Sequence, residues 1–230
     1  MITKDEAQNL LQDFLKIESI TPDVGDAFDF LERLFIKYNF EVQRVKFKSD
    51  DSYEVENMFA TIGSTAPHFC FAGHADVVTP GQVSDWSRPP FSGYIENNTI
   101  FSRGAEDMKG ALISSIIAGI NYIQNPIDQN HRLSYLITGD EEGIAINGTK
   151  PTLEWLSNEG IKIDDCVEVP SGNETALKMA VSRGPVSVAI EADTLTFQTY
   201  KGGILDSSKC GTNLDHGVLV VGYGEEDGVN

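Results

Sequence analysis

The chain has 230 residues, enough to bury a full hydrophobic core in one large domain or in two small ones. Acidic residues outnumber basic ones by 35 to 17, which gives a formal net charge of −18 and an isoelectric point near 4.4. This charge repels phosphate backbones and anionic lipid surfaces, so we expect neither nucleic acid nor a membrane as a partner.

The N-terminal segment and the cysteines favour a cytoplasmic protein. No run approaches the roughly 18 apolar residues of a membrane span, and the first residues lack the layout of a signal peptide. Cys70, Cys166 and Cys210 are an odd number of cysteines at unrelated spacings, which argues against a disulfide framework or a cysteine zinc site.

Hydrophobic periodicity predicts helices alternating with strands over the first 167 residues. Thr3 and Glu6 form a capping box ahead of the first helix. Helices are expected at about 4–17, 26–38, 109–124 and 151–159. Strands are expected at 41–47, 57–62, 67–78, 100–102, 131–138 and 161–167. This alternation indicates an α/β fold with a mostly parallel sheet flanked by helices.

Polar clusters fall where such a sheet would bring them together. His74 and Asp76 close one predicted strand, and Asp107 stands just ahead of a predicted helix. Glu141 and Glu142 follow another strand. Because binding sites in parallel α/β sheets form beyond the carboxyl ends of the strands, we predict one crevice that holds all five side chains.

These residue types suit hydrolysis at a metal site. An imidazole and carboxylates bind divalent cations, and such a metal lowers the pKa of its bound water to about 7. A neighbouring carboxylate that stays free of the metal can then take a proton as general base. Asp107 has two oxygens and can bridge two ions about 3.5 to 4 Å apart.

Each of these side chains also has an ordinary structural interpretation. Taken singly, Glu141 and Glu142 are equally well helix N-terminal acids favoured by the dipole, and Asp107 is an N-cap. The remaining ionisable neighbours are expected to be solvated or to belong to the core: Glu106, Lys109, His68 and His131.

Four segments of the N-terminal part carry a family resemblance: 71–78, 86–91, 103–110 and 138–143. They resemble the catalytic domain of the succinyl-diaminopimelate desuccinylases, within the co-catalytic zinc aminoacylase and carboxypeptidase family. The resemblance implies hydrolysis of a small N-acyl amino acid, N-succinyl-LL-2,6-diaminopimelate, to succinate and LL-diaminopimelate in lysine biosynthesis. It also implies one or two zinc ions, with cobalt as a substitute, and a homodimer.

The same resemblance assigns roles to individual residues. His74 would bind one zinc ion, Asp107 would bridge both ions, and Glu142 would bind the second. Asp76 would orient His74, and Glu141 would be the general base.

The resemblance breaks after Val167. The family has a Gly-Glu-Pro turn that supplies a carboxylate to the first zinc, whereas Val169 precedes the proline here. Glu168 replaces that ligand only if the strand end shifts its register, because a slip of one residue turns a side chain to the other face. The distal histidine and the lid domain are also missing, so weak metal binding and low or no turnover are expected.

Residues 168–230 form a smaller, β-rich segment with a different pattern. A predicted helix at 173–181 and a strand at 185–192 precede the segments 197–204 and 214–224. This order is similar to the C-terminal domain of papain-like cysteine proteases, which implies that His216 is the catalytic histidine and Cys210 a disulfide cysteine.

The nucleophile motif of that family, Cys-Gly-Ser-Cys-Trp, is absent, so we expect His216 to be an orphan. The sequence thus predicts a chimera of a metallohydrolase domain at 1–167 and a papain-like segment at 168–230. Two alternatives stay open, a cysteine peptidase fragment without its nucleophile and a non-catalytic α/β module with a β-appendage.

Overall fold

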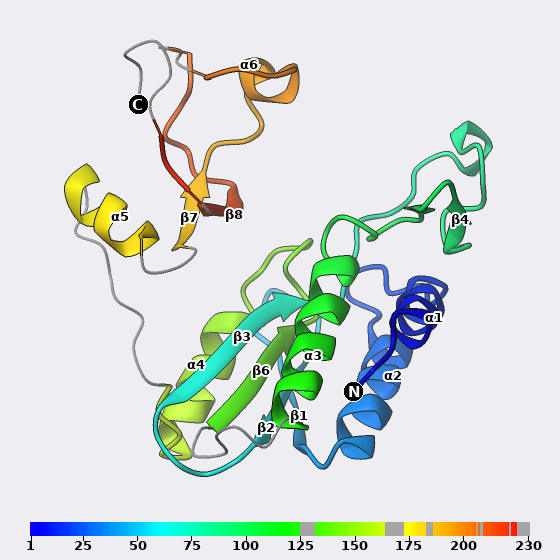
Figure 1. Cartoon of the computed structure of the whole chain (residues 1–230), viewed down its shortest axis with the longest axis vertical. Helices are drawn as coiled ribbons and strands as arrows, with labels where there is room; N and C mark the ends of the chain where they lie inside the picture. Colours follow the sequence, from blue (N-terminus) through cyan, green and yellow to red (C-terminus); the bar gives the residue numbers. More distant parts are fainter. Residues whose placement is uncertain are drawn as a thin grey trace. The chain divides into compact units, whose positions relative to one another are not determined.

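The computed structural model describes residues 1–124, 132–163, 173–182, 186–205, 207, 209–220 and 222–224. The chain divides into two compact units, Met1–Asp164 (unit 1) and Asp165–Asn230 (unit 2), drawn from blue to yellow-green and from yellow to red in Figure 1. The predicted boundary between residues 167 and 168 lies outside the described residues and stays a prediction.

Unit 1 is built on a four-stranded sheet in the order β1-β2-β6-β3. The strands are β1 (Glu41–Phe47), β2 (Val55–Ile62), β3 (His68–His74) and β6 (Arg132–Thr138). β1 and β2 are antiparallel, β2 and β6 are antiparallel, and β3 and β6 are parallel. The α/β class predicted from the sequence is confirmed, but the mostly parallel direction is wrong for this sheet. The loop between β1 and β2 is too short for the crossover that a parallel pair requires.

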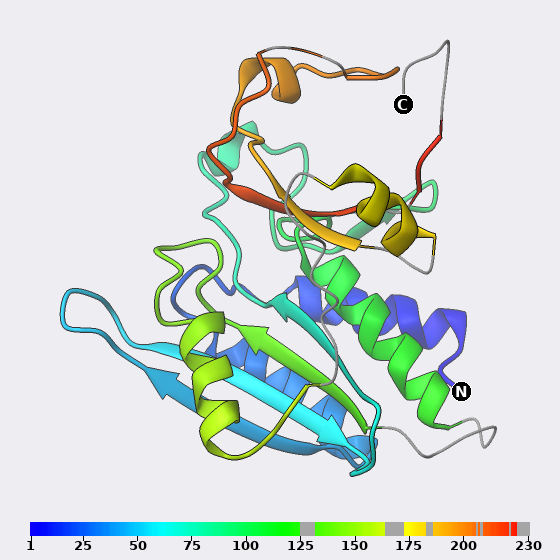
Figure 2. The same cartoon turned by 90° about the vertical axis from the view of Figure 1, so that its left-hand side faces the viewer.

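The helices α2 (Gly25–Lys37), α3 (Lys109–Ile123) and α4 (Thr149–Asn158) pack on this sheet, and α1 (Lys4–Leu15) packs against α3. The capping box of α1 is confirmed, since Thr3 Oγ1 accepts from the Glu6 backbone and Glu6 Oε2 accepts from the Thr3 backbone. Figure 2 shows α4 in front of the sheet and α2 behind it.

Alternation along the central strands gives each face of the sheet its own core. On β6, Tyr135 and Ile137 pack with α2 and α3, whereas Leu136 packs with α4. Among the described residues, the larger core contains four aromatic side chains without exposed surface, which come from three elements: Phe14, Phe28, Phe35 and Tyr135. These two cores fix the sheet and therefore the position of its strand ends.

Between β3 and α3 the chain forms the short helix η1 (Val83–Asp85) and the hairpin β4 (Tyr94–Glu96) and β5 (Thr99–Phe101). Gln12 Nε2 on α1 donates to the Gly93 carbonyl over 2.8 Å, which ties this segment to α1. The strand predicted at 161–167 is wrong for 161–163, which are not in a strand, and its other residues lie outside the described part.

The described part of unit 2 contains α5 (Glu174–Val181), β7 (Val186–Ile190), α6 (Leu195–Gln198) and β8 (His216–Val220). β7 and β8 are antiparallel. Within the residues that the structure describes, no helix is long and apolar enough to cross a membrane.

Candidate metal centre

The parallel pairing of β3 with β6 brings two of the predicted clusters to one edge of the sheet. His74, the last residue of β3, is in register with Thr138, the last residue of β6. Beyond them, the backbone nitrogen of Ala75 donates to the Thr138 carbonyl over 3.0 Å. The segments that follow β3 and β6 therefore begin side by side at the carboxyl ends of the two parallel strands, where ligands of α/β sheets bind.

The metal-type side chains converge at this edge. His74 Nε2 lies 3.0 Å from Asp107 Oδ1. One ligand atom each from His74, Asp107 and Glu142 lie within 4.8 Å of one another. Glu141 Oε2 lies 3.6 Å from His74 Nε2, beside this group. His74 is 4% exposed, whereas Asp107 and Glu141 are about half exposed, so the cluster has a buried wall and an open side.

Asp76 has no exposed surface and connects the two strand ends. His74 Nδ1 lies 2.9 Å from the Asp76 backbone oxygen and 3.4 Å from its Oδ1. The carboxylate accepts from the backbone nitrogens of Glu141 and Glu142, over 3.3 and 3.0 Å, and from Thr21 Oγ1 over 2.7 Å. Asp76 therefore contacts His74 as expected and also fixes the backbone that carries both glutamates.

The electrostatics of the cluster favour a cation. Burial lowers the pKa of His74, but the hydrogen bonds to Asp107 and Asp76 outweigh burial and raise this pKa to about 10. Burial and the neighbouring carboxylate of Asp107 raise the pKa of Glu142. Burial also raises the pKa of Asp76, but its hydrogen bonds to His74 and Thr21 lower it overall. A divalent ion among these carboxylates would relieve their mutual repulsion.

Two residues that sequence reasoning missed hold the segment after β6. Tyr53 Oη donates to Asp140 Oδ1 over 2.6 Å, and the backbone nitrogen of Asn147 donates to Asp140 Oδ2 over 3.4 Å. Asp140 is 1% exposed, so it is a structural carboxylate. Tyr53 carries no local signal, because it lies 87 residues before Asp140 in the chain.

The other predicted residues have mixed outcomes. His68 is a core histidine, one of the two expected interpretations, and its ring nitrogens contact the Lys162 carbonyl and Ser134 Oγ, each over 2.6 Å. Lys109 was expected to be solvated, but it has no exposed surface. His216 lies exposed on β8, in register with Ile190 of β7. Three further residues lie outside the described part of the chain: His131, Cys166 and Glu168.

A cavity of about 260 Å³ lies next to the loop before Asp107. Its lining includes Trp86, Arg88 and Phe101 together with Glu106, which is exposed as expected. None of the converging metal-type side chains lines it, so this cavity is separate from the cluster itself.

Fold and cluster together define an α/β protein with metal-type ligands at the carboxyl edge of its sheet. The chain is 40% identical over 177 residues to the succinyl-diaminopimelate desuccinylase of Rhodopseudomonas palustris (strain TIE-1), which covers 76% of this chain and 46% of that protein. It is 42% identical over 158 residues to the succinyl-diaminopimelate desuccinylase of Pelagibacter ubique, which covers 69% of this chain and 41% of that protein. The chain thus spans about half the length of the curated relatives it matches.

Solved structures show the same fold. An M20 family metallo-carboxypeptidase from Sulfolobus solfataricus matches with a TM-score of 0.58 at 28% identity, over 67% of this chain and 35% of that one. Human carnosine dipeptidase 1 matches with a TM-score of 0.57 at 22% identity, over 70% of this chain and 37% of that one.

Residues 108–230 match the family described as papain family cysteine protease. Because this match covers more than half of the 230 residues, the chain belongs to that family through this stretch. The match begins in unit 1, at the residue before α3, and includes all of unit 2. Both resemblances seen in the sequence are thereby confirmed, in agreement with a chimeric chain.

Proposed function

We propose that unit 1 is the catalytic domain of a zinc-dependent amide hydrolase of the desuccinylase type. Its substrate is N-succinyl-LL-2,6-diaminopimelate, and its products are succinate and LL-diaminopimelate. The convergence of His74, Asp107 and Glu142 within 4.8 Å carries the proposal. The names of the curated relatives, at about 40% identity, support the choice of substrate.

The donors present fit a zinc ion. His74 Nε2 and carboxylate oxygens of Asp107 and Glu142 would hold it, a set of nitrogen and oxygen ligands that zinc prefers in catalytic sites. Glu168 stays the predicted further ligand. When bound, the ion polarises the amide carbonyl and makes water a stronger acid.

The chain's own residues supply the proton transfers and the orientation. Glu141 Oε2 takes a proton from the attacking water and then gives it to the leaving amine nitrogen, so that the amide yields a carboxylate and an amine. The backbone nitrogen of Glu141 is held by Asp76, which keeps this carboxylate beside His74. The Asp76 backbone oxygen accepts from His74 Nδ1, so Nε2 is the ring nitrogen that would act as a ligand after it loses its proton.

Calorimetric titration of the metal-free chain with zinc tests this proposal. We expect stoichiometric binding that Glu142→Ala weakens by more than about a hundredfold, because even the loss of an outer partner of a metal ligand costs about 10 to 100-fold. His216→Ala is the matched control. His216 is exposed on β8, and its removal should leave the titration unchanged.

Glu141→Ala separates the base from the ligands. It should keep zinc affinity within about threefold and lower succinate release by about 10² to 10⁴-fold, the usual contribution of general base catalysis. A parent chain that binds no zinc, or a Glu142→Ala chain that binds it as tightly, would contradict the proposed metal centre.

The papain family match at residues 108–230 carries a second candidate, a thiol peptidase. Within the described residues of unit 2, no thiol lies within hydrogen-bond distance of His216, and Cys210 is free and exposed. Labelling of Cys210 or Cys166 by a thiol-directed inhibitor, with loss of a measured peptidase activity, would support this candidate.

A further inference from the structure

Lys109 is a fully buried cation next to the proposed metal centre. Its side chain has no exposed surface, and no described carboxylate forms an ion pair with it. Lysine is almost never fully buried without a partner, because removing its charge from water is costly. Burial accordingly lowers the pKa of Lys109 to about 8.

The partner of this ammonium group is the carbonyl end of α1. Lys109 Nζ donates to the Ile17 carbonyl over 2.7 Å and to the Phe14 carbonyl over 3.4 Å. It also lies 4.9 Å from the centroid of the Phe14 ring. Because α1 ends at Leu15, both carbonyls lie at its C-terminal end, where the helix dipole is negative. The Phe14 carbonyl also accepts from the Ile17 backbone nitrogen over 3.3 Å.

Lys109 also closes the loop that carries Asp107. Its backbone nitrogen donates to the Gly104 carbonyl over 2.9 Å. Gly104 has φ +75°, and a Cβ there would lie 2.6 Å from Val77 Cγ1, so only glycine fits. The loop from 104 to 109 is therefore pinned at its first residue by close packing and at its last residue by the buried ammonium group.

Asp107 itself lacks such packing. Its side chain is 51% exposed, although its Oδ1 must stay 3.0 Å from His74 Nε2. A half-exposed carboxylate is held less by burial than a buried one, so the ends of its loop contribute to its position. Lys109 is two residues away, at the first position of α3.

We propose that Lys109 is a positioning residue whose ammonium group anchors the start of α3 to the carbonyl end of α1 and thereby directs Asp107 toward His74. The part of this inference that concerns metal affinity rests on the proposed function. In Figure 2, α3 crosses close to α1, as this anchor requires.

The test compares Lys109→Met with Leu112→Ala. Methionine keeps the length and the apolar stem of lysine but removes the charge and the donors. Leu112 is 3% exposed on the same helix, so Leu112→Ala destabilises α3 without touching the anchor. Amide hydrogen exchange of the metal-free chains and zinc titration of all chains are measured.

We expect Lys109→Met to increase exchange at 104–110 at least tenfold and to weaken zinc binding about 10 to 100-fold, in the range seen for outer partners of metal ligands. Leu112→Ala should leave the zinc affinity within about threefold of the parent chain, even if it lowers the melting temperature as much as Lys109→Met does. Lys109→Gln keeps a neutral donor, so it should show smaller changes in hydrogen exchange and zinc affinity in the same direction. It replaces Lys109→Met in the test if Lys109→Met does not fold.

Unchanged exchange at 104–110 in the Lys109 variants, or an affinity loss no greater than that of Leu112→Ala, would overturn the inference. The exchange measurement needs no metal. A parent chain that bound no zinc would therefore count against the proposed function, while the exchange result would still decide the anchor.

Discussion

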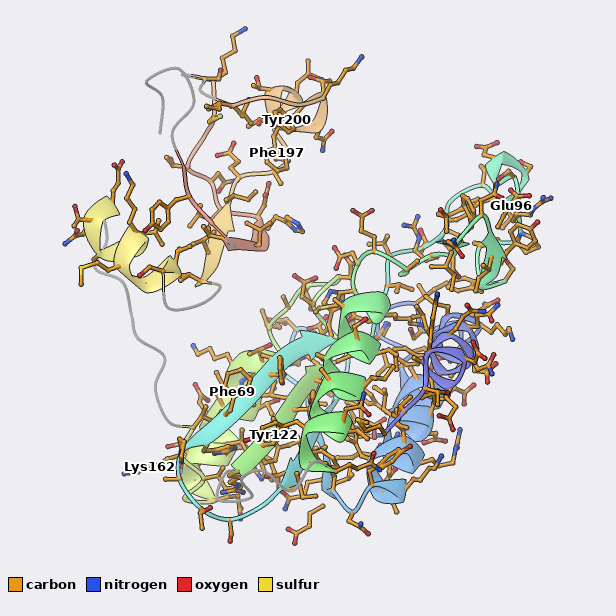
Figure 3. The ribbon with its side chains drawn as sticks, viewed as in Figure 1. Phe69, Glu96, Tyr122, Lys162, Phe197 and Tyr200 are labelled. Atoms are coloured by element: carbon orange, nitrogen blue, oxygen red, sulfur yellow. The ribbon has the colours of Figure 1, made fainter. Side chains whose placement is uncertain are left out.

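Unit 1 and unit 2 differ in how completely they bury their apolar side chains. Unit 1 buries large apolar residues from several helices and strands, such as Phe28 of α2 and Phe59 of β2, at 0% exposure. Among the side chains of unit 2 whose burial the structure describes, Val181 is the one buried apolar residue, while Leu195 is 77% exposed and Leu214 62% exposed. Figure 3 labels two further exposed aromatic side chains of this unit, Phe197 and Tyr200, near α6.

This difference explains why the candidate site lies in unit 1. A metal centre needs ligands held within fractions of an ångström, which a packed core around the strand ends supplies. His74 is the last residue of such a strand, whereas the exposed His216 begins a strand of a two-stranded sheet. A chemically suitable side chain is thus not enough without a core that fixes its position.

The largest expected effect separates the two units by a matched pair of substitutions. Phe28→Ala should lower the free energy of unfolding by about 3–5 kcal/mol, because it opens a cavity in a closed core. Phe197→Ala should change it by less than about 0.5 kcal/mol, since Phe197 is 37% exposed. Urea unfolding is followed by far-UV circular dichroism, which reports both units, because both tryptophans, Trp86 and Trp155, lie in unit 1. Equal losses would show that unit 2 supports the chain as firmly as unit 1.

The next effect is the pH dependence of zinc binding. The hydrogen bonds of His74 to Asp107 and Asp76 raise its pKa to about 10 despite burial, so the imidazole is protonated at neutral pH in the metal-free chain. A zinc ligand must be deprotonated, and binding should therefore release about one proton from His74. Affinity should rise about tenfold per pH unit below that pKa.

Calorimetry at neutral pH in buffers of different ionisation enthalpy counts the protons released. His216→Ala should give the same count, because His216 belongs to the other unit. Zinc binding without proton release would mean that His74 is neutral in the metal-free chain.

The smallest expected effect lies within unit 1. Thr21→Val removes one of the donors to the buried Asp76 carboxylate and should weaken zinc binding a few-fold, about 1 kcal/mol. Thr152→Val is the matched control, because the fully buried Thr152 donates to the Gly148 carbonyl over 2.8 Å on α4. The control should lower stability similarly and leave zinc affinity unchanged. Equal zinc affinities of the two variants would show that the hydrogen bond from Thr21 does not contribute to zinc binding.

Much of the fold could be predicted because its signals are local. The helix expected at 109–124 is α3, Lys109–Ile123, since its apolar residues recur with helical spacing over the whole length. The capping box at Thr3 was also predicted, because both of its partners lie within one turn. Strand direction was mispredicted, because it depends on which strands become neighbours and not on their own residues.

The sequence by itself determined most of the helices and strands, the metal-type residues at the strand ends and the two family resemblances. The tertiary structure alone decided that Asp76 holds Thr21 and the backbone of both glutamates, and that Lys109 is buried against α1. These contacts join residues 55 to 92 positions apart in the chain. Local spacing carries no trace of them, because they exist only once the core has brought distant segments together.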